Sequence, residues 1–431
     1  MTNRTWLIIF GDFLSFLISF ILLIFIRFSP DQYLSAIDSH TVPFLLLYLI
    51  WVLIFYIFGL YDLVTIKPTI PYMKRWALAL ASSFVVGLIL FYLAPIFGIY
   101  PKMNLLIQVV LFGFFSFFFR RTIYTLFAKG ITEPVILVGT STYLKELENT
   151  IKANPQIGLS IVSHLEGMNE MKSVEKITKN LVIILDKKID SPDEKILELY
   201  KHGCSIIDTA KAYEKYLFKI PVGYIDMSFV VENINIKKDV AYNIMTFIVN
   251  KLFAIIILVL CSPILLVSGV FIYLNDKGPI FYTQNRVGLD GNIFRLYKLR
   301  SMTTNAEKDG AVWATGASDP RVTRVGRVIR KLHIDEIPQM INILRGDLSL
   351  VGPRPERPEF VTPLEGKIPH YNLRHIIRPG FTGWAQIKYR YANTIEDSKE
   401  KFEYDLYYIK NRNIFIDFGI ILRTIIIIFT H

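Results

Sequence analysis

The sequence predicts a membrane protein in four parts: four N-terminal transmembrane helices, a small Rossmann-like α/β domain, a re-entrant membrane helix and a cytoplasmic α/β domain with interfacial helices. Three observations support this prediction. Hydrophobic residues make up 52% of the 431 residues, which is high for a soluble chain. Four long apolar runs open the chain, and a fifth run has basic residues on both sides. We place the parts at 1–129, 130–236, 237–275 and 276–431.

Each of the four opening runs is close in length to the roughly 20 helical residues that cross a bilayer core. Basic residues follow the second and the fourth run, whereas the two remaining loops carry only Arg27 and Lys102. The positive-inside rule therefore places the N-terminus and the chain after Phe119 in the cytoplasm. A buried helical bundle is the alternative, but the runs are too long and too free of charge for it. The runs cover Trp6–Ile26, Val42–Leu60, Trp76–Gly98 and Asn104–Phe119.

Residues 130–236 differ in composition from the spans. Short apolar runs alternate with polar, helix-like stretches such as Ser191–Lys201, and this alternation predicts a small α/β domain with a parallel sheet. The first run ends in Val-Gly-Thr-Ser-Thr, where a dinucleotide site would need several glycines but only Gly139 is present. A lone glycine is more typical of a turn, so we expect dimerisation or regulation here in preference to cofactor binding. The short apolar runs are Val135–Val138, Leu181–Leu185 and Ser205–Ile207.

Residues 252–274 form the fifth apolar run, which hydropathy alone would assign as another span. If it crossed the membrane, the rest of the chain would lie outside the cell, yet basic residues on both sides argue against crossing. Ser262-Pro263 stands in the middle of the run, and proline removes a backbone donor and predicts a kink. We therefore favour a re-entrant hairpin over a kinked span. The flanking basic residues are Lys237, Lys238 and Lys251 before the run, and Lys277, Arg286, Arg295, Lys298 and Arg300 after it.

The segment from Asp276 to His431 is polar and basic and contains no further clean span. Its last apolar run, from Asn413 to Thr430, is interrupted by Asp417 and Arg423, a pattern that suits a helix lying at the membrane interface. The whole chain has a net charge of +11. This balance suits anionic lipid headgroups, phosphorylated substrates or nucleic acid.

Two acidic residues stand side by side in His333-Ile-Asp-Glu-Ile-Pro-Gln339, just after a basic stretch that includes Arg330. Adjacent helical residues point about 100° apart, so Asp335 and Glu336 would not share one task. One carboxylate can attack phosphorus and form an acyl-phosphate, and the other can hold Mg²⁺ on a diphosphate. The alternative is a plain helix start, where acidic residues complement the helix dipole.

An arginine lies between two prolines in Gly346-Asp-Leu-Ser-Leu-Val-Gly-Pro-Arg-Pro355. The prolines restrict the backbone, and the planar guanidinium of Arg354 suits phosphate; a surface arginine in a proline-rich turn is the alternative. Arg378-Pro-Gly-Phe-Thr-Gly-Trp-Ala-Gln386 has glycine turns beside an aromatic residue, which suits a base or a sugar. Further candidate donors close to the membrane exit are Arg286, Lys298 and Arg300.

Taken in this order, the motifs closely resemble the bacterial sugar transferase domain of polyprenyl-phosphate sugar phosphotransferases, the phosphoglycosyl transferases that initiate glycan assembly. The resemblance covers about residues 250 to 430, and it implies that 276–431 is the catalytic domain. The preceding spans and α/β domain are similar to the N-terminal half of the large members of that family. Two further stretches carry the resemblance, Gly278-Pro-Ile-Phe-Tyr-Thr-Gln-Asn-Arg-Val-Gly288 and Phe294-Arg-Leu-Tyr-Lys-Leu-Arg-Ser-Met302.

The resemblance implies a two-step exchange of a sugar phosphate. Asp335 would attack the β-phosphate of a UDP-sugar, release UMP and hold the phospho-sugar, which undecaprenyl phosphate would then accept. Glu336 would bind Mg²⁺ as the cofactor, and Ser262-Pro263 would break the membrane helix. Substrate would be bound by Arg354, Lys298, Arg300, Arg286, Arg330 and Gln386.

The resemblance also implies a location and partners. The chain would be a multi-pass protein of the bacterial inner (cytoplasmic) membrane, with its catalytic domain on the cytoplasmic side and in contact with membrane lipid. We expect no nucleic-acid partner, and a homodimer stays open.

One element departs from the family pattern. Family members usually carry Lys-Arg-x-x-Asp in the first half of the re-entrant helix, where this chain has Thr246, Phe247 and Asn250. The anchor of the helix is therefore altered, and Lys251 is the candidate substitute.

Other functions stay open at this point. A membrane-bound nucleotide-sugar dehydratase would need a glycine-rich dinucleotide turn and a Tyr-x-x-x-Lys pair, and the pair Tyr273 and Lys277 has no such turn near it. A non-catalytic membrane scaffold of glycan assembly would not need the intact acidic pair and arginine. A channel or transporter would need polar groups within the spans, where Asp12 and Gln108 are the notable ones.

Overall fold

The computed structural model describes residues 3–93, 102–130, 132–167, 170, 181–186, 194–234, 240–304, 306, 319–389 and 394–429. The chain divides into two compact units, Met1–Ala212 and Tyr213–His431, and each is described by itself. Parts of four sequence predictions lie outside the described residues: the end of the third apolar run, the start of Ser191–Lys201, the pair Lys237 and Lys238, and Thr430.

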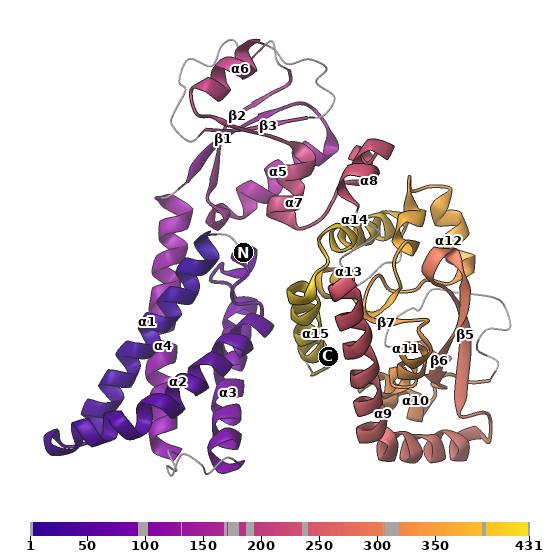
Figure 1. The fold of residues 1–431 in the computed structure, drawn as a ribbon, viewed down its shortest axis with the longest axis horizontal. Helices are drawn as coiled ribbons and strands as arrows, with labels where there is room; N and C mark the ends of the chain where they lie inside the picture. The colour runs from indigo at the N-terminus through magenta and orange to yellow at the C-terminus, as the bar shows by residue number, and fades with distance from the viewer. Residues whose placement is uncertain are drawn as a thin grey trace. The chain divides into compact units, whose positions relative to one another are not determined.

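The first unit begins with four long apolar helices, which confirms the prediction for this part of the chain (Figure 1). They are α1 (Asn3–Arg27), α2 (Tyr33–Ile57), α3 (Ile70–Leu93) and α4 (Lys102–Lys129). Aromatic side chains fill the space between them: Trp51 of α2 is fully buried, and its ring lies 5.2 Å from that of Phe112 on α4. Within the described residues, five helices are long and apolar enough to cross a membrane, namely these four and α9.

Asp12 and Arg120 form a buried ion pair that joins α1 to α4. The guanidinium also donates to the carbonyl oxygen of Leu60 at 2.7 Å, and Ser116 donates to the Asp12 carboxylate at 2.8 Å. A charge inside a membrane bundle is unfavourable unless it is paired, and both charges here have partners within the bundle. Gln108 likewise donates to a serine hydroxyl of α1 at 2.8 Å. The polar groups of the spans therefore serve helix packing, which does not favour a transport path.

A four-stranded parallel sheet with strand order β2-β1-β3-β4 follows in the first unit and confirms the predicted parallel sheet. The central strand β1 is buried from Val135 to Val138, as expected for a parallel strand with both faces covered. The elements are β1 (Glu133–Val138), α5 (Thr142–Ala153), β2 (Leu159–Leu165), β3 (Val182–Leu185), α6 (Glu194–Lys201) and β4 (Ser205–Asp208). Helix α7 (Thr209–Leu217) follows and contains the boundary between the two units.

The glycine turn after β1 is occupied by an acidic side chain. Gly139 has a φ of +133°, and a Cβ at this position would collide with Asp186, which follows β3. The Asp186 carboxylate accepts a hydrogen bond from the backbone nitrogen of Ser141 at 3.1 Å, at the start of α5. A dinucleotide would place its phosphate at such a helix start. A carboxylate at this place repels a phosphate, so the geometry does not favour cofactor binding here.

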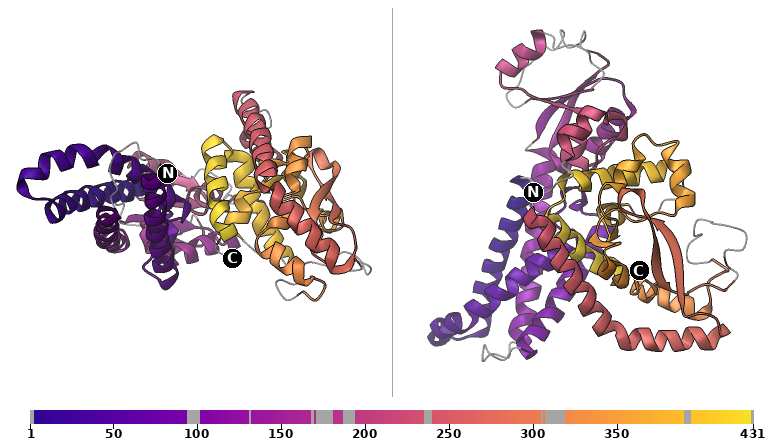
Figure 2. Two further views of the ribbon diagram at one scale, coloured as in Figure 1. Left: turned by 90° about the horizontal axis from the view of Figure 1, so that it is seen from below. Right: turned by 45° about the vertical axis from the view of Figure 1, so that its right-hand side comes forward.

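The second unit contains α9 (Val240–Asp276), a 37-residue helix with Pro263 inside it. Figures 1 and 2 show that α9 has two arms that meet at a bend. Because Pro263 has no N–H, the carbonyl oxygen of Val259 four residues earlier loses its helical donor. The hydroxyl of Ser262 donates to that same carbonyl at 2.8 Å. The Ser-Pro pair therefore bends the helix and satisfies the freed carbonyl within the helix itself.

Both arms of α9 pack against the C-terminal α/β region. Ala254 of the first arm lies in a core with Leu296 and Met340, and Ile272 of the second arm lies in a core with Leu299 and Ile329. Most of the remaining apolar side chains of α9 are exposed. One side of the helix is thus bound to protein along both arms, and the other side presents an apolar surface.

The C-terminal region holds two small sheets surrounded by short helices. Strands β5 and β6 form an antiparallel hairpin, and β7 pairs with β8 in parallel. The elements are α8 (Met227–Asn233), β5 (Phe281–Val287), β6 (Ile293–Leu299), α10 (Arg324–Lys331), α11 (Gln339–Arg345), β7 (Ser349–Val351), α12 (Pro358–Glu365), β8 (Gly380–Thr382), α13 (Trp384–Lys388), α14 (Ile395–Asn411) and α15 (Ile414–Phe429).

The last helix, α15, directs its acidic residue inward. Asp417 is buried and accepts hydrogen bonds from the hydroxyls of Tyr242 and Tyr408, both at 2.7 Å. Phe415 and Phe418 on the same helix are exposed. The sequence pattern predicts an interfacial helix because Asp417 interrupts the apolar run, and the structure places this charge inside and the apolar Phe415 and Phe418 on the exposed face.

Candidate active site

The acidic pair lies in a tight turn between two helices of the C-terminal region. Asp335 and Glu336 belong to a short 3-10 helix, Ile334–Glu336, between α10 and α11. The turn begins at His333, whose φ of 55° reverses the chain direction. Asp335 is 8% exposed, and within the described residues no cation forms an ion pair with it. The pair is therefore part of a compact turn and does not start a long solvent-exposed helix.

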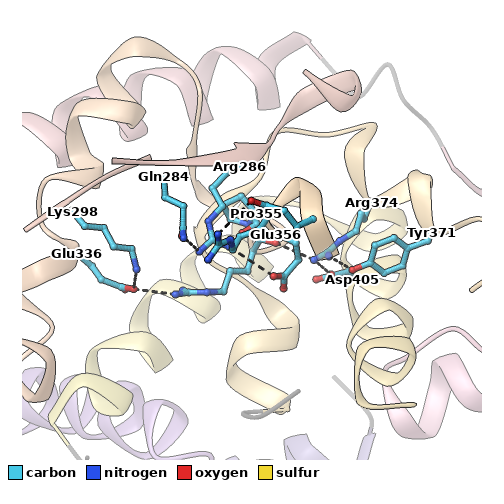
Figure 3. A network of polar contacts seen from close by, with 12 residues as sticks. Gln284, Arg286, Lys298, Glu336, Pro355, Glu356, Tyr371, Arg374 and Asp405 are labelled. Carbon is cyan, nitrogen blue, oxygen red and sulfur yellow. Dashed lines mark hydrogen bonds and ion pairs between the residues drawn. The ribbon is translucent and has the colours of Figure 1, made fainter. Parts of the chain in front are cut away.

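Glu336 is held by two cations that come from different elements (Figure 3). Lys298 of β6 donates to its Oε1 at 2.9 Å, and Arg354 from the loop after β7 donates to the same oxygen at 3.0 Å. Burial alone would raise the pKa of Glu336, but Lys298 and Arg354 together lower it well below its usual range. Glu336 is therefore ionised at neutral pH.

Asp335 has the opposite electrostatic character. Burial, and then the negative charge of Glu336, raise the pKa of Asp335 to about 6, although Lys298 and Arg330 act against the rise. A carboxylate with this pKa is largely ionised at neutral pH and is less stabilised than an ordinary surface carboxylate. The two neighbouring carboxylates thus differ in their surroundings: Glu336 is neutralised by cations, and Asp335 is poorly solvated.

The turn Pro353-Arg354-Pro355 is held through its backbone. The carbonyl oxygen of Pro353 accepts a hydrogen bond from the nitrogen of Gly380 at 2.8 Å. A Cβ at Gly380 would collide with the backbone of Gly352, so only glycine permits this close approach. The glycines of the Arg378–Gln386 motif therefore bring β8 against the Pro-Arg-Pro turn, which is a structural role that the sequence argument did not assign to them.

Of the other predicted binding residues, Arg330 and Arg286 lie near this centre. Arg330 donates to Ser301 Oγ at 2.8 Å and lowers the pKa of Asp335 electrostatically. Arg286 donates to the carbonyl oxygen of Pro355 at 3.0 Å and to Gln284 at 2.6 Å. Arg286 therefore supports the turn that carries Arg354.

Arg300 and Gln386 have other contacts in the structure. Arg300 is buried and pairs with Asp276 at the end of α9, against the backbone of Gly278. Gln386 lies on α13 and donates to the carbonyl oxygen of Phe381 at 3.2 Å. Within the described residues neither side chain is hydrogen-bonded to the acidic pair or to the arginine between the prolines. These contacts indicate that Arg300 fixes the end of α9.

Asn250, the residue that departs from the family pattern, joins α9 to β7. Its Nδ2 donates to Ser349 Oγ at 2.9 Å, and its Oδ1 accepts from the backbone nitrogen of Leu350 at 3.2 Å. The neighbouring Lys251 donates to the carbonyl oxygen of Leu344 at the end of α11. Although the anchor differs from the family pattern, the side chains of Asn250 and Lys251 still bind the first arm of α9 to the segment that leads to Pro353-Arg354-Pro355.

Sequence reasoning missed a buried ion pair behind the site, Arg374 with Asp405. These residues are far apart in the chain, and no motif connects them. One signal was available: Asp405 lies between Phe402, Leu406 and Ile409 on the buried face of α14, where an acidic residue is unexpected unless it has a partner. Burial raises the pKa of Asp405 to about 6, and the positive charge of Arg374 acts against the rise.

The acidic pair fits a cation site that substrate would complete. Among the described residues, no group of three or more His, Cys, Asp and Glu side chains could enclose a metal ion. Mg²⁺ is commonly held by one or two carboxylates together with substrate phosphates and water. Both ion pairs of Glu336 use Oε1, so in the described part of the chain Oε2 stays open to a further ligand.

Comparison with known proteins identifies relatives of this same C-terminal region. Residues 241–431 match the family described as Bacterial sugar transferase. UDP-N-acetylgalactosamine-undecaprenyl-phosphate N-acetylgalactosaminephosphotransferase of Aeromonas hydrophila is 50% identical over 177 residues, 41% of this chain and 42% of that protein. UDP-glucose:undecaprenyl-phosphate glucose-1-phosphate transferase of Escherichia coli (strain K12) is 39% identical over 174 residues, 40% of this chain and 37% of that protein.

A shorter relative is covered over most of its length. An uncharacterized sugar transferase of Bacillus subtilis (strain 168) is 41% identical over 172 residues, 40% of this chain and 81% of that protein. The matches to the Aeromonas and Escherichia proteins, by contrast, span less than half of the length of each.

Proposed function

The chain belongs to the bacterial sugar transferase family, and on this premise we propose that it transfers a sugar-1-phosphate from a UDP-sugar to undecaprenyl phosphate. The product would be an undecaprenyl diphosphate sugar, on which exopolysaccharide, capsule, O-antigen or a glycoprotein glycan is assembled. The relative from Aeromonas is named for N-acetylgalactosamine, so UDP-N-acetylgalactosamine is the first donor to assay.

One observation carries the proposal: a buried carboxylate that has no ion pair among the described residues stands next to a carboxylate that two cations hold. Lys298 and Arg354 converge on Glu336, while Asp335 has a raised pKa. Stability alone does not explain a poorly solvated acidic group at this place, because burial of a charge without a partner is unfavourable. Perturbed groups of this kind are typical of reactive sites.

The reaction consists of two displacements at one phosphorus atom. In the first, an oxygen of the Asp335 carboxylate attacks the β-phosphorus of the UDP-sugar. The bond from that phosphorus to the bridging oxygen breaks, and UMP leaves with this oxygen. In the second, an oxygen of undecaprenyl phosphate attacks the same phosphorus and the aspartyl oxygen leaves, which restores the carboxylate. Arg354 and Lys298 would bind the phosphate oxygens, whose charge they offset during each displacement.

Mg²⁺ would be held by Glu336 together with the diphosphate oxygens of the donor, and it would offset their charge. Arg330 would keep Asp335 ionised through its positive charge, as its effect on the pKa indicates. Arg286 would hold the Pro-Arg-Pro turn through the carbonyl of Pro355.

We also propose that α9 enters and leaves the membrane on its cytoplasmic face. The support is that side chains before and after Pro263, Ala254 and Ile272, both pack into the C-terminal region. A helix that crossed to the other face would carry its second arm away from that region. The hydrogen bond from the Ser262 hydroxyl to the carbonyl oxygen of Val259 also suits a bend in an apolar environment, because a carbonyl without a donor is unfavourable there.

The proposal is tested by nucleotide release from the purified full chain in nanodiscs. With Mg²⁺, undecaprenyl phosphate and a UDP-sugar, the protein should release UMP, and Asp335→Asn should release none. Asp290→Asn is the matched control, because Asp290 is exposed and its left-handed φ of 54° suits Asn. Release of UDP in place of UMP, or full activity in Asp335→Asn, would overturn the mechanism.

A further inference from the structure

We propose that Arg374 and Asp405 form a positioning pair that aims Arg354 at the phosphates of the donor. This inference rests on the proposed function and extends it to two residues that do not touch substrate. Figure 3 shows Arg374 beside Asp405. One guanidinium nitrogen of Arg374, Nη2, donates both to Asp405 Oδ2 and to the carbonyl oxygen of Arg354, each at 3.0 Å. The side chains of Arg374 and Asp405 are 5% and 2% exposed.

The guanidinium of Arg374 is fixed from a second direction. Its Nη1 donates to the hydroxyl of Tyr371, and its carbon lies 5.0 Å from the centre of the Tyr371 ring. That ring in turn lies 5.2 Å from the ring of Phe402 on α14. Helix α14 therefore carries Asp405 itself and holds the Tyr371 ring through Phe402, so one helix fixes both of these partners of the guanidinium. Arg374 has therefore little freedom to rotate.

The carbonyl that Arg374 binds belongs to an unusual turn. Two of the three residues in Pro353-Arg354-Pro355 are prolines, which have no N–H to donate within the turn. All three carbonyl oxygens instead accept hydrogen bonds from outside the turn. Their donors are, in order, the nitrogen of Gly380 at 2.8 Å, Arg374 Nη2 at 3.0 Å and Arg286 Nη1 at 3.0 Å.

These hydrogen bonds determine where the Arg354 side chain can point. The direction of the Cα–Cβ bond, from which a side chain starts, follows from the planes of the two peptide groups on either side of the Cα. Gly380 holds the peptide group before Arg354, and Arg374 holds the one after it. A residue that precedes proline is already restricted in ψ, and the bond from Arg374 selects one orientation. The arginine side chain then reaches Glu336 from a fixed base.

Stability alone does not explain why a charged pair occupies this place. Burying two charges requires their desolvation, and well-packed apolar residues of similar size often stabilise a fold as well as a buried ion pair does. Arg374 and Asp405 are both buried, and Phe402 and Leu406, which flank Asp405 on α14, belong to an apolar core. A guanidinium, however, can hold a carboxylate and a backbone carbonyl at once through its planar set of donors.

The test is a double-variant cycle on the full chain in nanodiscs, with UDP binding measured by calorimetry and UMP release measured separately. Arg374→Lys keeps the charge but loses the planar set of donors, so we expect the Kd for UDP to rise about tenfold in a variant that still unfolds in one cooperative thermal transition. Arg354→Ala should weaken UDP binding at least as much. If Arg374 acts through Arg354, adding Arg374→Lys to Arg354→Ala should have no further effect.

Two controls separate positioning from general damage. Arg345→Lys alters a guanidinium that likewise lies over a tyrosine ring, 4.9 Å from that of Tyr297, and it should leave UDP binding unchanged. If Arg374→Lys does not fold, Asp405→Asn keeps an acceptor for the guanidinium and takes its place in the cycle.

Each result decides the question. Additive effects of the two variants, normal UDP binding in folded Arg374→Lys, or no UDP binding by the unaltered protein would each overturn the positioning role. If the unaltered protein binds UDP with the expected coupling but releases no UMP with any donor, the proposed function fails while the positioning pair stands.

Discussion

Acidification should stop the first displacement by protonating Asp335. Burial, and secondarily the neighbouring Glu336, raise the pKa of Asp335 to about 6, whereas attack on phosphorus requires the carboxylate. With a pKa of about 6, about nine-tenths of Asp335 is ionised at pH 7 and about one-tenth at pH 5. The rate constant for UMP release should therefore fall about tenfold for each pH unit below the pKa.

A second acidic group titrates in the same range, because burial also raises the pKa of Asp405 to about 6. Asp405→Asn removes this titration, so the loss of rate at low pH should persist in that variant if Asp335 causes it. Arg330→Gln gives a directional test. The charge of Arg330 lowers the pKa of Asp335, so its removal should shift the loss of rate to higher pH. Arg345→Gln is the matched control and should not shift it.

The assay is rapid quenching of a single turnover, with protein in excess over a radiolabelled UDP-sugar. Undecaprenyl phosphate is left out, so that titration of its own phosphate does not enter the result. A rate that stays constant from pH 7 to pH 5 would refute the assignment of Asp335 as a nucleophile with a raised pKa. A loss of rate that does not move in Arg330→Gln would refute the electrostatic account of that pKa.

Four further predictions follow from the same contacts. The pKa of Asp335 rises from 3.8 to about 6, so its ionisation lowers the stability of the fold as the pH increases through this range. Asp335→Asn should therefore raise the free energy of unfolding by about 3 kcal/mol at pH 7, which would be measured as a higher melting temperature. Asn250→Ala removes two hydrogen bonds and should destabilise the protein by about 1–3 kcal/mol, whereas Asn250→Asp should destabilise it by less. Equal melting temperatures for the two variants would contradict this prediction. Asp12→Asn should destabilise the helix bundle by about 3–5 kcal/mol, and adding Arg120→Met should recover part of the loss in the same thermal assay. In a background without native cysteines, Lys367→Cys at an exposed position should react with an impermeant maleimide only in inverted membrane vesicles. Labelling in intact cells would instead support a topology in which α9 crosses the membrane.

Much of the architecture is already determined by local features of the sequence. Apolar runs about as long as a bilayer is thick predict the four N-terminal helices, because hydropathy acts on each segment independently of its neighbours. Alternating short apolar runs predict the parallel sheet for the same reason. The kink of α9 follows from Pro263, since the loss of a backbone donor does not depend on tertiary contacts. The adjacency of Asp335 and Glu336 predicts that the two carboxylates have different surroundings, since neighbouring residues of a helix do not face one partner.

The partners of polar and charged groups are decided only by the tertiary structure. The sequence does not predict that Arg300 pairs with Asp276 or that Gln386 donates to the carbonyl oxygen of Phe381. The inward orientation of Asp417 likewise depends on two tyrosines distant in the chain.

Even the chemistry of the acidic pair depends on packing. Lys298 and Arg354 neutralise Glu336 because β6 and the Pro-Arg-Pro turn meet at this place, and Asp335 has no ion pair in the described part of the chain. A pattern in the sequence records which residues are polar. The folding of distant segments onto each other determines which polar groups are buried together. It thereby determines which of the two carboxylates is neutralised by cations and which has a raised pKa.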